Sequence, residues 1–91
     1  MSFVMHVVIQ AMHTTVGVYL NEGEERLLQD FLIHLSRRAP RIQGEYLHDD
    51  IDKRKDNCPD DEPINGHSHI KSALYSNPSI SLIVSEGSLL V

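Results

Sequence analysis

The sequence predicts an α+β fold, a two-layer sandwich in which two helices cover one face of a mixed or antiparallel sheet of four to five strands. Residues 3–20 and 79–85 alternate apolar and polar side chains with the period of two that is typical of strands. Residues 27–35 carry apolar side chains at helical spacing. A chain of 91 residues has room for one domain, 1–91, and the expected element order is β-β-α-β-α-β.

The first segment predicts two strands joined by a turn. Apolar side chains occupy odd positions in residues 3–11 and even positions in residues 16–20. Because successive side chains point to opposite faces, one regular strand cannot keep both sets on one face. We therefore expect a turn near residues 12–15 and a hairpin in which Ile9 pairs with Val18. A bulge within one long strand is the alternative.

The first helix is expected to follow directly. Asn21 is a favourable N-cap, and Glu24 stands three residues later in the capping-box position. The helix then presents one apolar stripe, formed by Leu27, Leu28, Phe31, Leu32 and Leu35. Arg37 and Arg38 suit the negative end of a helix dipole, and Pro40 ends the helix.

A weaker strand is predicted at residues 41–47, with Gly44 marking a bulge. A second, shorter helix follows a long loop, because Ile70, Ala73 and Leu74 share one helical face. Asn77 and Pro78 should end this helix.

The last strand is predicted at residues 79–85, with Ile80, Leu82 and Val84 facing the core. Glu86 and Gly87 are expected to turn it back onto residues 89–91 as a short hairpin.

Two helices cannot cover both faces of such a sheet. Val4, Val8 and Ile83 point away from the expected core, so these side chains should be exposed in a monomer. This pattern predicts a homodimer that forms through a sheet face or edge.

Composition excludes several classes of protein. One cysteine excludes an internal disulfide and a thiolate-rich zinc site, and indicates the cytoplasm. No apolar run approaches the 20 or so residues that a membrane helix needs, so no membrane association is expected. The net charge of −5 argues against nucleic-acid binding. The sequence has no glycine-rich loop of the kind that binds a phosphate-bearing cofactor, so no cofactor is expected.

The excess negative charge is concentrated in a long loop, residues 48–66. Residues 49–62 hold seven acidic and three basic side chains, which leaves a charge of −4. We expect this acidic loop to bind a protein partner that has a basic surface. The predicted partner-binding residues are Asp49, Asp50, Asp52, Asp56, Asp60, Asp61 and Glu62. A solvated loop with no function is the other interpretation of the same composition.

The function predicted from these features is that of a small acidic cytosolic regulator, resembling an inhibitor or antitoxin of the kind that phages and mobile elements encode. Such a protein would bind a macromolecule through the acidic loop and a sheet edge, and would not be an enzyme. No motif marks a nucleophile, and the carboxylates around Cys58 disfavour its thiolate form. His6, His13 and His34 are not expected to be catalytic.

The alternative function is a metal-binding protein or a metal-dependent hydrolase. An extended His-x-His segment places both imidazoles on one face, where they can share a divalent ion. The candidate ligands are His48, Asp49, Asp50, His67 and His69. This site requires residues 67–69 to be extended, because a helix would turn His67 and His69 about 200° apart. A third possibility is a structural subunit whose loop has no role.

Overall fold

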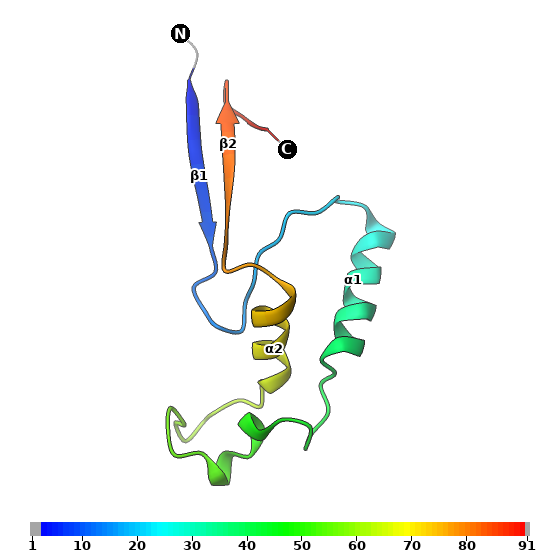
Figure 1. Ribbon diagram of the computed structural model, residues 1–91, viewed down its shortest axis with the longest axis vertical. Coiled ribbons are helices and arrows are strands. Elements are labelled where there is room, and N and C mark those ends of the chain that lie inside the picture. Colours follow the sequence, from blue (N-terminus) through cyan, green and yellow to red (C-terminus); the bar gives the residue numbers. More distant parts are fainter. Residues whose placement is uncertain (1–2, 91) are drawn as a thin grey trace.

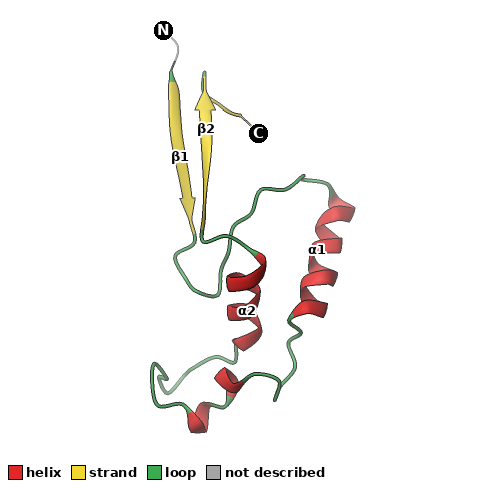
Figure 2. Ribbon diagram, in the orientation of Figure 1, coloured by secondary structure: helices red, strands yellow, loops and turns green. Residues whose placement is uncertain are grey.

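The computed structural model describes residues 3–90 and shows three strands and two helices, a small α+β fold (Figures 1 and 2). The elements are β1 (Val4–Gln10), α1 (Glu25–Arg38), α2 (Gly66–Tyr75), β2 (Ser79–Ser85) and β3 (Ser88–Leu90). Two short 3-10 helices, Leu47–Asp49 and Ile51–Lys53, interrupt the loop that joins α1 to α2. Both predicted helices are present, whereas the predicted sheet of four to five strands and the order β-β-α-β-α-β are wrong.

The sheet is antiparallel throughout, with the strand order β1-β2-β3. Ile9 is paired with Ile80 and not with Val18, and the same register pairs Val7 with Leu82. The predicted hairpin between residues 3–11 and 16–20 is therefore wrong, although the chain does turn at Thr14 and Thr15.

The reason is that a later segment lies between the two predicted arms. The Ala11 amide donates to the Pro78 carbonyl at 2.8 Å, and Val18 and Asn77 exchange two backbone hydrogen bonds of 2.9 Å. Residues 77–78 thus occupy the position that a hairpin partner would take. Val18 forms only an isolated bridge, so residues 16–20 are not a strand.

The strand predicted at residues 41–47 is also wrong, because this segment closes on itself. The Glu45 amide donates to the Ile42 carbonyl at 3.3 Å, and Gly44 has a φ of 91°. The Tyr46 hydroxyl then donates to the Pro40 carbonyl at 2.6 Å. These local bonds replace the ladder that a strand would need.

Helix α1 confirms the apolar stripe and the stop before Pro40, but it begins later than an Asn21 N-cap predicts. The Glu24 side chain is the cap: it accepts hydrogen bonds from the amides of Arg26 and Leu27, the latter at 3.1 Å. Arg37 and Arg38 occupy the last turn, as expected.

The C-terminal hairpin is confirmed. Glu86 and Gly87 have φ values of 54° and 77°, the positive pair that a two-residue hairpin turn requires. The turn pairs Ser85 with Ser88. The last residue of the predicted strand, Val91, lies outside the described residues.

The helices do not cover the sheet, so the predicted two-layer sandwich is wrong as well. Helices α1 and α2 contact each other, and the paired strands β1 and β2 extend beyond them at the top of the view (Figure 1). One sheet face is apolar at every position: Met5, Val7, Ile9, Ile80, Leu82, Val84 and Leu89. Met5 is 55% exposed and Leu89 52%. Val4, Val8 and Ile83 on the opposite face are exposed, as predicted.

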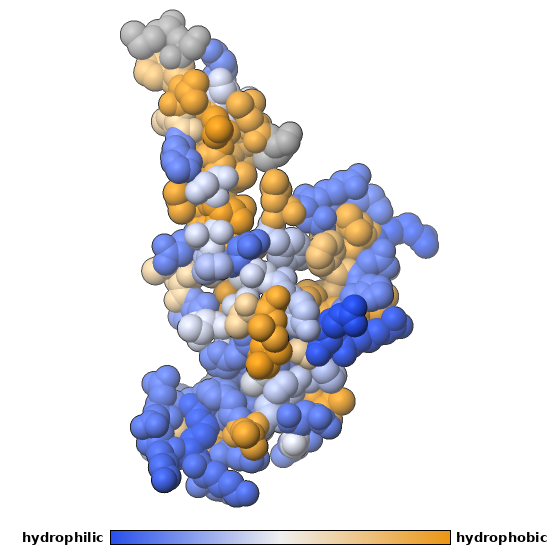
Figure 3. Space-filling model, viewed as in Figure 1, coloured by the Kyte–Doolittle hydropathy of each residue, from blue (hydrophilic) through white to orange (hydrophobic). Residues whose placement is uncertain are grey.

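The described chain has an unusually large surface. Its accessible area is 7555 Å², whereas a compact protein of 10.3 kDa exposes about 5,400 Å². Its radius of gyration is 17.5 Å, against about 12 Å expected for this length. Apolar side chains gather visibly on the paired strands β1 and β2, and hydrophilic ones cover the loop at the other end (Figure 3). An apolar sheet face of this kind is typical of an interaction surface. None of the helices in residues 3–90 has the length and apolar character needed to cross a bilayer.

The close approach of Gly17 to Ser76 supports a first prediction. A Cβ at position 17 would lie 1.6 Å from the Ser76 Oγ and 2.4 Å from its Cβ. Gly17→Ala should therefore separate the two segments and weaken the Val18–Asn77 bridge by about 1–3 kcal/mol. We expect faster hydrogen exchange at the Val18 and Asn77 amides. Gly23→Ala is the control, because a Cβ there meets no atom within 4 Å; equal exchange in both variants would refute the prediction.

Candidate functional site

A polar pocket of about 290 Å³ lies where three distant parts of the chain meet. Its lining comes from the turn after β1, from the loop before α2 and from the first turns of α2. The lining residues are His13, Thr14, Thr15, His48, Arg54, Asn57, Pro59, Glu62, Asn65 and His69. Three imidazoles and a guanidinium thus surround this pocket together with a single carboxylate, in a chain whose net charge is −5.

Two of the imidazoles are in direct contact. The rings of His48 and His69 lie edge to face, with centroids 4.6 Å apart and planes at 76°. The His48 Nε2 atom is buried and has no hydrogen-bond partner within residues 3–90. It lies 4.0 Å from the Glu62 Oε1 atom, which is too far for a hydrogen bond.

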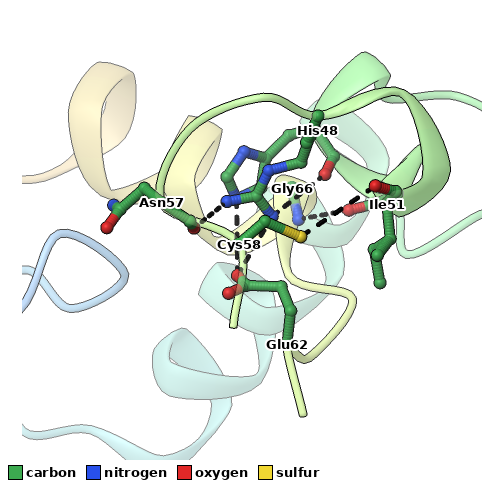
Figure 4. A network of polar contacts seen from close by, with 8 residues as sticks. His48, Ile51, Asn57, Cys58, Glu62 and Gly66 are labelled. Atoms are coloured by element: carbon green, nitrogen blue, oxygen red, sulfur yellow. Dashed lines mark hydrogen bonds and ion pairs between the residues drawn. The ribbon is translucent and has the colours of Figure 1, made fainter. Parts of the chain in front are cut away.

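The loop around His48 is held by a largely buried ion pair. Arg54 Nη1 lies 3.2 Å from the Glu62 carboxylate, and both side chains are 11% exposed. The same guanidinium donates to the His48 carbonyl at 3.5 Å and to the Asn57 carbonyl (Figure 4). The acidic loop is therefore organised around Arg54, one of the three basic residues inside it.

Asp49 positions the start of α2. Its Oδ1 atom accepts a hydrogen bond from the Gly66 amide at 2.9 Å, which satisfies one of the free donors of the helix N-terminus. Of the predicted partner-binding residues, Asp49 and Glu62 are therefore engaged within the chain. Asp50 is half-buried. The remaining predicted partner-binding residues are exposed, namely Asp52, Asp56, Asp60 and Asp61. Binding of a basic partner by these residues stays a prediction.

The metal alternative depended on an extended His-x-His segment, and this segment is helical. Because α2 begins at Gly66, His67 and His69 point in different directions. His69 meets His48, whereas His67 Nδ1 lies 2.9 Å from Lys71 Nζ. Among residues 3–90, no three His, Cys, Asp or Glu side chains are grouped so that they could hold a metal ion.

His67 belongs to a separate corner of the molecule. Burial lowers the pKa of its imidazole, the charges of Lys71 and Arg41 lower it further, and the Asp49 carboxylate partly opposes them. A neutral His67 imidazole can accept a hydrogen bond from the Lys71 ammonium at its Nδ1 atom, which agrees with their short contact. Tyr46 lies at the same corner, where burial and then the Glu45 and Asp49 carboxylates raise the pKa of its hydroxyl.

Sequence reasoning missed His13. The segment His13–Thr15 begins three residues after the end of the apolar strand β1, and the Val16 amide donates to the His13 carbonyl at 3.3 Å to close the turn. Three polar side chains at the end of an apolar strand are a recognisable signal for a site. Only the fold, however, brings His13 to a pocket that His48 and His69 also line.

The chain matches the family model described as "UPF0047 protein YjbQ-like" over residues 5–91. It is also similar to a UPF0047 protein from Archaeoglobus fulgidus, with 32% identity over 83 residues. That alignment covers 91% of this chain and 56% of the relative, so the chain spans about half the length of the curated relative. No solved structure matches the chain.

These matches contradict the predicted inhibitor or antitoxin function. The prediction rested on charge and size, and neither the family description nor the relative's name indicates such a role. The matched region includes the whole polar pocket, from His13 to His69. This chain belongs to the UPF0047 YjbQ-like family.

Proposed function

We propose that the polar pocket binds a small anion and that His48 exchanges a proton with it. The observation that carries this proposal is the meeting of His13, His48 and His69 at one pocket. Imidazole is the side chain that gains and loses a proton near neutral pH, and its N–H groups donate hydrogen bonds to anions. The Glu62 charge is already paired with Arg54, and each protonated imidazole therefore adds uncompensated positive charge.

His48 is the best placed of the three for proton transfer. Its buried Nε2 atom lacks a hydrogen-bond partner in residues 3–90, and the Glu62 Oε1 atom lies 4.0 Å from that same nitrogen. A general acid or base acts through a ring nitrogen that can form a hydrogen bond with its ligand. An acid–base group beside a bound anion is an arrangement found in enzymes, so this proposal departs from the expectation of a non-enzymatic protein.

The test is a titration of the chain with inorganic sulfate, followed by the imidazole NMR signals. Sulfate keeps its charge between pH 6 and 8, so any pH dependence reports on the protein. We expect saturable shifts of His13, His48 and His69, and tighter binding at pH 6 than at pH 8. His6 and His34, which lie outside the pocket, are internal controls. Equal, non-saturating shifts at all five histidines would overturn the proposal.

Two matched variants separate binding from proton exchange. His48→Gln removes a charge-assisted hydrogen bond and should weaken sulfate binding about tenfold to a hundredfold. His34→Gln is the same substitution on exposed α1 and should change nothing. The ¹⁵N shifts of His48 show which ring nitrogens carry protons. Sulfate carries no proton at these pH values, so a proton that His48 gains on binding comes from water. If sulfate binds and His48 takes up no proton, the acid–base role of His48 in the proposal is wrong.

A further inference from the structure

An apolar groove lies next to the polar pocket, between the end of β1, helix α2 and the start of β2. Its volume is about 510 Å³, within the range of small-molecule sites. Apolar contacts in this groove come from Ala11, Met12, Val16, Ala73 and Pro78.

The walls of the groove are joined by hydrogen bonds. The Ser72 Oγ atom on α2 donates to the Val16 carbonyl at 2.7 Å. The Ala11 amide donates to the Pro78 carbonyl at 2.8 Å on the other side. These bonds hold three chain segments around the groove, so its shape does not depend on a bound molecule.

The groove and the polar pocket share a wall. His13 and Thr14 line both cavities, so they meet at the turn after β1. A molecule that occupies both cavities would cross from one to the other beside His13 and Thr14. The polar side has the cationic groups that an anion needs, and the groove has the apolar surface that a hydrocarbon needs.

We infer that the ligand of this site is an amphipathic anion, with its charged group in the polar pocket and a hydrocarbon body in the apolar groove. This inference rests on the proposed function and names its ligand class. His13 and Thr14 would contact the junction between the two parts of the ligand. Affinity should then depend on the length of the hydrocarbon body, because each methylene buried in the groove leaves water.

The experiment compares methyl, ethyl, butyl and hexyl phosphate at pH 7.5, where all four carry the same charge. We expect the affinity to rise about threefold to fourfold per methylene until the groove is filled. Hexyl phosphate should also show nuclear Overhauser contacts from its chain to the methyl groups of Met12 and Ala73. These contacts are measured on the unaltered protein, so they do not depend on whether a variant folds.

Ala73→Leu narrows the groove and should abolish the rise in affinity with chain length. Leu74→Ala, at the next position on α2, lies outside the groove lining and is the matched control. If methyl phosphate binds at His48 and the longer esters bind no better, this inference is wrong and the proposed function stands. If none of the esters shifts His48 or His69, the proposed function fails as well.

Discussion

Leu82→Asp is expected to weaken self-association of this chain by at least tenfold. Leu82 lies on the middle strand of the sheet, paired with Val7, within the face that is apolar at every position. A carboxylate there would lose its hydration whenever the face is covered. The penalty exceeds the roughly 1.4 kcal/mol that corresponds to a tenfold change in an association constant.

The expectation that this face is covered in solution follows from its exposure. The described chain exposes about 2,000 Å² more than a compact protein of its mass, which is comparable to the surface buried in a large interface. The exposed side chains Val4, Val8 and Ile83 predict self-association through the opposite face or an edge of the sheet. The helices leave the face that carries Leu82 uncovered, and this face is apolar at every position. It is therefore the better candidate for the surface through which the chain associates with itself.

Mass by light scattering at high micromolar concentration is the measurement. We expect the unaltered chain to associate and Leu82→Asp to shift the distribution to single chains. Ser81→Asp is the control, because it adds the same charge one residue away on the opposite face. A single-chain mass for the unaltered protein would contradict the prediction, and so would an equal effect of the two substitutions.

Glu62→Gln is expected to open the loop that carries His48. The substitution removes the partner of Arg54, whose side chain is only 11% exposed, and leaves a guanidinium charge with little access to water. Removing one partner of a buried ion pair costs about 2–4 kcal/mol. The loss should be local, because Arg54 joins the His48 and Asn57 carbonyls within the same loop.

Limited proteolysis with trypsin measures this opening at Lys53 and Lys55. We expect cleavage to become at least tenfold faster in Glu62→Gln. Asp61→Asn makes the same change in charge at the adjacent exposed position and should have little effect. Replacing Arg54 by Met in the Glu62→Gln background should restore part of the protection, because no unpaired charge then remains. Equal cleavage rates in Glu62→Gln and Asp61→Asn would show that the ion pair does not hold the loop.

The helices were predictable because their signals are local. The stripe from Leu27 to Leu35 and the stop at Pro40 defined α1, and Asn77 and Pro78 bounded α2. The start of α1 differs from the prediction because both Asn21 and Glu24 can cap a helix. The Glu24 carboxylate accepts hydrogen bonds from the first amides of α1, and Asn21 lies too early in the chain to do so.

The candidate site was predictable only in part. The predicted metal site included His48 and His69, and the rings of these two residues are in contact. It also included His67, which could share an ion with His69 only in an extended segment, whereas residues 66–75 form a helix. It also treated Asp49 as a ligand, whereas this carboxylate accepts the Gly66 amide. His13 carried no spacing signal, because it is 35 residues from His48 along the chain.

The sequence by itself determined the two helices, the Glu86–Gly87 turn and the alternation of the strands, because these depend on residues a few positions apart. Only the tertiary structure decided that β1 pairs with β2 and that His13, His48 and His69 share a pocket. The physical reason is that alternating strands pair equally well with several partners of the same pattern. The choice of Ile80 over Val18 as the partner of Ile9 depends on contacts across 71 residues, which no local pattern records.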